Sequence, residues 1–226
     1  MKMDCSSAKT VMVVGGRVVV VLATVVLFAG PLQAQETNTA NAVALHLRPI
    51  ASDPTVPGFH RGTQEAGIAL GLGWVPADGR DHSAHTFELS KFHYGWTLGD
   101  TFVPGYWCRG HWEILQEIFA GAQSSPMVRY LAGETTVLRY NFATGTRWLP
   151  YVDGGFGVLA TDIGHPNLGS IFEFNEFAGL GMNYFWRADC ALNFEYRFTH
   201  ISNGGIAEPN GGLDAHILYA GVSWFF

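Results

Sequence analysis

The amino-acid sequence predicts an all-β fold, an eight-stranded antiparallel transmembrane β-barrel of the outer membrane. Of the 226 residues, 14% are aromatic and 28 are glycine, and few stretches are typical of helices, which together favour strands. The chain divides into segments of alternating polarity that reach ten residues or more, the length that a tilted strand needs to cross a bilayer. On several segments polar residues share one face and aromatic residues the other, which suits a barrel with a polar interior better than a soluble sandwich.

The first segment, 1–34, has the pattern of a cleaved signal peptide. Three basic residues precede the apolar run VVVVLATVVLF, and Ala34 ends a suitable cleavage site. An uncleaved anchor is the alternative, although the run is shorter than the ~20 residues of a spanning helix. The segment holds three of the 13 Lys and Arg residues and one of the 19 Asp and Glu residues, so cleavage leaves 10 against 18, a net charge of −8. This balance argues against a nucleic-acid partner.

The barrel is expected to occupy residues 65–226, after a leader arm at 35–64 that is either disordered or periplasmic. The leader has no clear period, although VALHLR could form a short strand or helix. The eight strands are expected at 66–75, 84–98, 106–119, 128–143, 149–161, 170–185, 188–201 and 213–226. Connections after the second, fourth and sixth strands are mostly the shorter ones, which predicts periplasmic turns there and outward-facing loops elsewhere. The loop 203–212 is therefore expected on the extracellular side.

The last strand ends in YAGVSWFF. Its aromatic residues and the terminal Phe226 resemble the assembly signal of bacterial outer-membrane proteins, which predicts the outer-membrane assembly machinery as a partner. An ordinary apolar edge strand is the alternative, but soluble proteins avoid such an exposed edge.

A histidine, a serine and an aspartate flank the loop 203–212. Alternation from Leu192 places His200 and Ser202 on the outward row of their strand, and the outward row of the last strand includes Asp214. Polar groups on a lipid-facing wall are costly unless they pair with one another, so this cluster is a candidate functional site. Imidazole can accept the serine proton, the carboxylate can hold the imidazole, and the hydroxyl oxygen can attack an ester. The alternative is an interfacial rim without catalytic function.

The same region carries a family pattern. The run H-x-S-N-x-G, followed by P-N-x-G and an acidic residue, resembles the lipid A 3-O-deacylase (PagL) and acyloxyacyl hydrolase family; its matching positions are His200, Ser202, Asn203, Gly205, Pro209, Asn210, Gly212 and Asp214. The resemblance implies an eight-stranded outer-membrane barrel with an outward-facing triad at the outer leaflet, in a diderm bacterium. The family has glutamate where this chain has Asp214, one methylene shorter.

The resemblance also implies roles for individual residues. His200 would be the general base, Ser202 the nucleophile, Asp214 the orienting acid, and Asn203 with the Gly205 amide the oxyanion site. The reaction would be hydrolysis of the ester-linked 3-hydroxyacyl chain of lipid A, the lipopolysaccharide component of the outer leaflet, without metal or cofactor. The acyl chain would lie along an outward wall of Leu192, Phe194, Phe198, Leu218 and Val222. Whether two copies associate as a homodimer is left open.

A different class of function fits the fold as well: a non-catalytic small barrel resembling OmpA or OmpW, acting as structural protein, adhesin or small-solute conduit. Other signals are weaker. His82, His85 and His93 could serve a metal but suit a membrane interface better, and Arg80 and Arg129 could contact phosphates or belong to a solvated rim. Alternation along the predicted strands places Cys108 and Cys190 on the outward rows of the third and seventh strands, which are not neighbours. This predicts free thiols.

Overall fold

A computed structural model describes residues 11–14, 17–20, 59–77 and 84–226. The strands β1 (Val11–Val14) and β2 (Arg17–Val20) pair as an antiparallel hairpin in a unit of their own. The cleavage site and most of the leader arm lie outside the described residues. No helix in the described ranges is long and apolar enough to cross a membrane.

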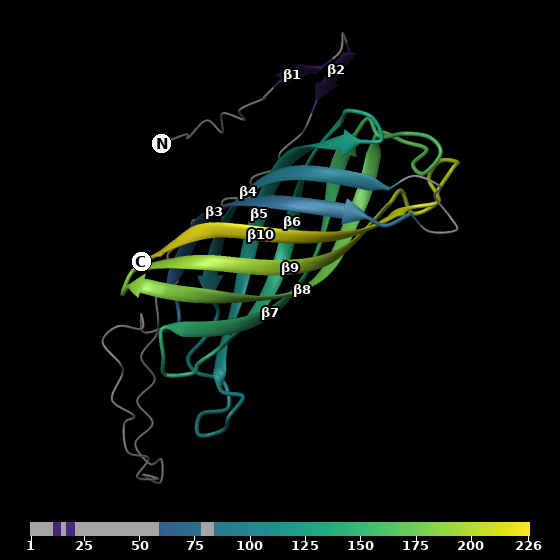
Figure 1. Cartoon of the computed structure of the whole chain (residues 1–226). Helices are drawn as coiled ribbons and strands as arrows, with labels where there is room; N and C mark the ends of the chain where they lie inside the picture. The colour runs from purple at the N-terminus through teal and green to yellow at the C-terminus, as the bar shows by residue number, and fades with distance from the viewer. Residues whose placement is uncertain (1–10, 15–16, 21–58, 78–83) are drawn as a thin grey trace, which may run out of the picture. The chain divides into compact units, whose positions relative to one another are not determined.

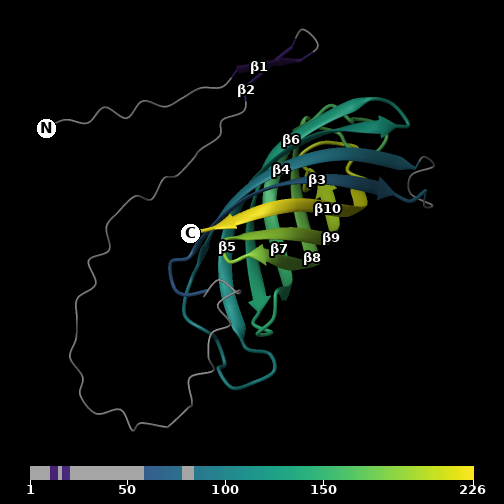
Figure 2. The same cartoon turned by 60° about the vertical axis from the view of Figure 1, so that its left-hand side comes forward.

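Eight antiparallel strands close into a barrel in which β10 pairs with both β3 and β9, so the predicted fold class is confirmed (Figures 1 and 2). The strands are β3 (Gln64–Val75), β4 (His85–Thr97), β5 (Gly110–Ser125), β6 (Arg129–Phe142), β7 (Trp148–Thr161), β8 (Phe172–Arg187), β9 (Cys190–Ser202) and β10 (Leu213–Phe225).

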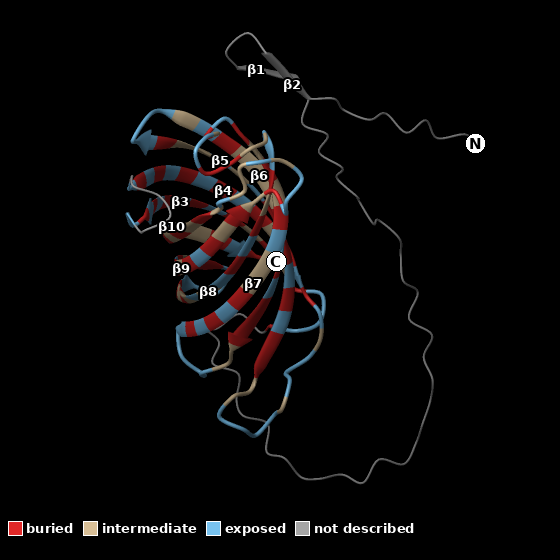
Figure 3. Ribbon diagram, turned by 90° about the vertical axis from the view of Figure 1, so that its right-hand side faces the viewer, coloured by how far each residue is buried: buried red, intermediate tan, exposed pale blue. Residues whose placement is uncertain are grey.

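Side-chain burial alternates along these strands, with buried and exposed bands following one another in Figure 3. The exposed row is largely apolar, with Leu70 and Leu72 on β3 and Leu218 on β10 more than half exposed. Such a continuous apolar outer wall is stable only against lipid.

The middle of the lumen is filled by paired charges. Lys91 lies 3.1 Å from Glu117 and 2.8 Å from Glu195, and Arg139 lies 3.1 Å from Asp153. Further ion pairs join Arg197 to Glu117 and to Glu195, and Nε2 of His93 lies 2.9 Å from Glu65. Nearly all these side chains are buried, and each charge has an opposite charge within reach, which is the condition for burying it at all.

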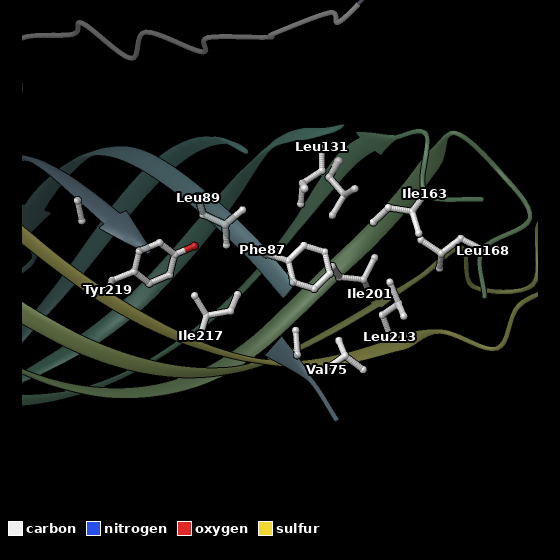
Figure 4. Packing of buried hydrophobic residues seen from close by; sticks show 13 residues of the cluster. Val75, Phe87, Leu89, Leu131, Ile163, Leu168, Ile201, Leu213, Ile217 and Tyr219 are labelled. Atoms are coloured by element: carbon white, nitrogen blue, oxygen red, sulfur yellow. The ribbon is translucent and has the colours of Figure 1, made fainter. Parts of the chain in front are cut away.

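Apolar layers lie on either side of this polar layer. Near the end of the barrel that carries the loop 203–212, Phe87, Leu131, Ile201, Leu213 and Ile217 belong to one cluster (Figure 4). Toward the other end a second cluster consists of Phe59, Leu149, Phe185, Ala191 and Phe225. Polar side chains are buried at these levels too, among them Gln123 and Asn175 near the first cluster and Asn183 and Asn193 near the second. The expectation of a polar interior therefore holds, with an apolar cluster added at each end.

Phe59, shortly before β3, packs against one end of the barrel. Its ring stacks on His111 at 5.5 Å and meets Phe225 edge-on at 5.4 Å. The residues just before β3 therefore pack into the barrel, because this end of the lumen offers an aromatic pocket.

The predicted third strand is wrong at both ends. Residues 102–109 form a loop in which Gly105 has φ +90° and Val103 has φ 43°, so β5 begins only at Gly110. It then continues to Ser125, because the turn-like text GAQSS pairs with β4 on one side and β6 on the other. The expected loop lengths are therefore wrong at two places. The connection after the second barrel strand, 98–109, is long, and the connection after the third, 126–128, is short. Cys108 lies in that long loop and not on an outward strand row.

Candidate active site

The polar cluster lies on the outer wall where β9 ends and β10 begins. His200 and Ser202 occupy the half-buried outward row of β9, and Asp214 occupies the corresponding row of β10, as strand phase predicted. His200 and Asp214 are direct cross-strand partners. Ser202 is two residues from His200 on the same face, about 7 Å along the strand, and it neighbours Phe174 of β8.

Of the three predicted residues, His200 and Asp214 form a hydrogen bond. The imidazole Nδ1 of His200 lies 2.6 Å from Oδ1 of Asp214. An ionised carboxylate only accepts hydrogen bonds, so Nδ1–H donates and Nε2 keeps its lone pair. The aspartate therefore reaches the imidazole despite its short side chain, because direct cross-strand pairing brings the two Cβ atoms close. Within the described part of the chain, no hydrogen bond joins the Ser202 hydroxyl to His200.

Gly212 packs against the edge of the imidazole. A Cβ on this residue would lie 2.8 Å from Cε1 and 3.4 Å from Nε2 of His200, and its φ is +73°. Both values restrict the position to glycine. A side chain here would push the imidazole away from its present position, so Gly212 positions the His200 ring. The motif contained this glycine, but only the structure assigns it this contact.

The loop 203–212 is braced by the neighbouring loop 162–171. The N–H groups of Gly211 and Gly212 donate to the carbonyl of Asn167, at 3.0 and 3.3 Å, and Leu168 forms a bridge with Asn210. Leu168 is fully buried. The two loops thus hold the start of β10, and with it Asp214, against the end of β9.

The two predicted oxyanion groups are engaged within the loop. The Asn203 side chain is fully buried; its Oδ1 accepts from the Gly205 N–H at 2.9 Å and its Nδ2 donates to the Ala207 carbonyl at 2.9 Å. Asn203 therefore braces the turn in this structure. A free donor toward Ser202 would require one of these bonds to be exchanged.

An aromatic group lies on the same outer wall beside the polar cluster. Nδ1 of His216 is hydrogen-bonded to the Tyr196 hydroxyl at 2.7 Å, and the His216 ring stacks on Trp74 with centroids 5.5 Å apart. Its polar atom is thus paired locally. The predicted acyl-chain wall follows along β9 and β10, where Phe194, Phe198 and Leu218 are 42–52% exposed and Leu192 and Val222 are half-buried.

The remaining predicted residues lie elsewhere. His85 and His93 point into the lumen and not toward the membrane interface: His85 lies 2.6 Å from Gln123, and His93 lies 2.9 Å from Glu65. Arg129 is the first residue of β6, whereas Arg80 and His82 lie outside the described residues. No His, Cys, Asp and Glu residues of the described ranges cluster as a metal site, and Cys108 and Cys190 are free thiols.

A closed eight-stranded antiparallel barrel with an apolar outer wall and a filled lumen defines a small outer-membrane β-barrel protein. The family model described as "Lipid A 3-O-deacylase (PagL)" matches residues 68–223. The chain belongs to this family.

Relatives agree with this assignment. The chain is 30% identical over 129 residues to the lipid A deacylase PagL of Pseudomonas aeruginosa, covering 55% of this chain and 67% of the relative. It is 28% identical over 144 residues to the PagL of Bordetella bronchiseptica, covering 55% of this chain and 76% of the relative. In fold it is similar to the crystal structure of the outer membrane enzyme PagL, with a TM-score of 0.51, 21% identity and coverage of 70% and 97%. Neisserial surface protein A gives a TM-score of 0.53, 15% identity and coverage of 73% and 96%.

Proposed function

We propose that this chain is an outer-membrane serine esterase that hydrolyses the ester-linked 3-hydroxyacyl chain of lipid A. The observation that carries the proposal is the His200–Asp214 pair, formed beside Ser202 on the lipid-facing wall of a barrel that belongs to the deacylase family. Polar groups on a lipid-facing wall cost free energy, so their presence there indicates a function.

The reaction follows from the tautomer that Asp214 imposes. The free Nε2 of His200 accepts the hydroxyl proton as the Ser202 oxygen attacks the ester carbonyl, and Asp214 stabilises the imidazolium. The tetrahedral intermediate collapses when the imidazolium protonates the sugar oxygen, which leaves as a hydroxyl, and the acyl group stays on Ser202. Water, activated by the same Nε2, then releases the 3-hydroxy acid and restores the serine.

Stabilisation of the oxyanion is assigned to the Asn203 side chain and the N–H of Gly205. Both donors lie in the turn directly after Ser202, where donors must converge if they are to reach the developing charge. Because both are bonded within the loop, the proposal requires that the bound ester exchanges with at least one of these bonds.

The outward position suits a substrate that is itself a membrane lipid. Lipid A of the outer leaflet can approach laterally, with its acyl chain along the wall that includes Phe194, Phe198 and Leu218, and needs no entry to the lumen. We propose that the active site lies at the outer leaflet. The protein would be exported by means of a signal peptide at 1–34 that is then cleaved, and inserted by the outer-membrane assembly machinery through the C-terminal Phe226. Within the described ranges the lumen is crossed by buried ion pairs, which argues against the alternative of a small-solute conduit.

The proposal is tested by mass spectrometry of lipid A from cells that express the wild type or Ser202→Ala. We expect loss of one 3-hydroxyacyl chain only with the wild type, at equal amounts of folded barrel in the outer membrane. An unchanged lipid A profile with the wild type would favour a structural barrel or another ester substrate.

A further inference from the structure

A second carboxylate lies on the opposite side of His200 from Asp214. Glu176 of β8 is the direct cross-strand partner of His200, on the exposed row of its strand. Directly opposite residues of an antiparallel pair have Cβ atoms about 5 Å apart. His200 is thus flanked by Asp214 from β10 and by Glu176 from β8.

Several polar residues of the outer wall are paired with a neighbour: Glu88 accepts a hydrogen bond from Ser124, Gln116 accepts one from Thr136, and Nδ1 of His216 is hydrogen-bonded to the Tyr196 hydroxyl. Among the described residues, neither Glu176 nor Glu134 of β6 makes a hydrogen bond or ion pair. Of these two carboxylates, Glu176 is the one that lies beside His200. An exposed carboxylate without a partner on an apolar wall is costly, and such residues in membrane proteins mark functional sites.

The imidazole does not need Glu176 for its orientation. Its Nδ1 is already held at 2.6 Å by Asp214, and a bond from Glu176 to Nε2 would occupy the nitrogen that must accept the serine proton. The carboxylate is therefore available to a molecule that lies over His200 and Ser202.

The chemistry of a carboxylate limits what it can recognise. It accepts hydrogen bonds from hydroxyl and amide N–H groups, and it repels phosphate. The glucosamine unit next to the scissile ester carries such donors. Resting on the proposed function, we infer that Glu176 is a substrate-binding residue that accepts a hydrogen bond from a sugar hydroxyl or amide N–H, and holds the sugar equally in the ground state and the transition state.

Glu134 provides a matched control. It lies on β6 with intermediate exposure, opposite the apolar residues Ile118 and Val158, and so away from the reacting groups. Replacing it by glutamine removes the same charge from the same kind of wall.

The test compares steady-state kinetics on purified lipid A for wild type, Ser202→Ala, Glu176→Ala, Glu176→Gln and Glu134→Gln, each checked for folding by heat-modified gel migration. Loss of a hydrogen bond to a charged group predicts a KM about tenfold higher or more for Glu176→Ala, with kcat little changed. The KM of Glu176→Gln should lie between those of the wild type and Glu176→Ala, because the amide oxygen still accepts a hydrogen bond. The KM of Glu134→Gln should match that of the wild type.

The outcomes separate the two proposals. A wild type no faster than Ser202→Ala overturns both the proposed function and this inference. An active wild type with unchanged KM in Glu176→Ala overturns the inference alone, as does a loss confined to kcat or a KM rise of equal size in Glu134→Gln.

Discussion

The contact between Asp214 and His200 gives the sharpest prediction for the catalytic machinery. Asp214→Asn keeps the size of the side chain but replaces an acceptor by a group that also donates, so the Nδ1–H proton and the free Nε2 are no longer fixed. In buried serine-hydrolase triads this change lowers kcat by about 10⁴-fold. Here the side chains of His200 and Asp214 are 35% and 42% exposed, and water can replace part of the lost bond. We therefore expect a fall of about 10²- to 10³-fold in kcat, equal to about 3 to 4 kcal/mol of transition-state stabilisation.

The assay is release of 3-hydroxy acid from lipid A by the refolded barrel, with Asp214→Glu as the matched variant. Because Asp214 already reaches the imidazole at 2.6 Å, a glutamate must fold its extra methylene into partly open space, and we expect activity within about tenfold of the wild type. The reasoning would be refuted if Asp214→Asn kept full activity, or if Asp214→Glu lost as much as Asp214→Asn.

Three further predictions concern the supports of the site. Gly212→Ala should lower kcat by at least about tenfold, because its Cβ meets the imidazole; a variant with wild-type kcat would contradict the positioning role. Asn203→Ala removes two hydrogen bonds of the turn and should lower the unfolding free energy by about 1 to 3 kcal/mol in urea titration, whereas no change would show that the turn holds without it. Arg139→Met leaves Asp153 without its partner and should destabilise the barrel by about 3 to 5 kcal/mol, and unaltered stability would mean that the lumenal network is dispensable.

The sequence predicted the barrel and the phase of its last strands because alternation is strong there. Leu192, Phe194 and Phe198 mark an outward row that runs without interruption into His200, and the register of β9 with β10 keeps it. A one-residue slip would have moved the whole cluster into the lumen. Long, regular strands therefore made the orientation of the candidate site predictable.

The sequence-based prediction failed where the structure depends on strand pairing or on contacts between distant residues and not on local composition. The segment GAQSS falls between the predicted strands 106–119 and 128–143 but is itself strand, because two neighbouring strands pair with it. The packing of Phe59 at the end of the lumen depends on His111 and Phe225, which are distant in sequence, and no local pattern signals it. The contact of Gly212 with the imidazole depends in the same way on how two loops meet.

Cleavage of lipid A in heavy-oxygen water tests the central claim most directly. Purified wild-type barrel and Ser202→Ala would be incubated with lipid A, and the released acid and the remaining glycolipid analysed by mass spectrometry. An acyl-enzyme at Ser202 that water resolves predicts one heavy oxygen in the carboxyl group of the released 3-hydroxy acid, none in the sugar, and no release by Ser202→Ala. Label in the sugar hydroxyl, or equal release by both proteins, would contradict the account.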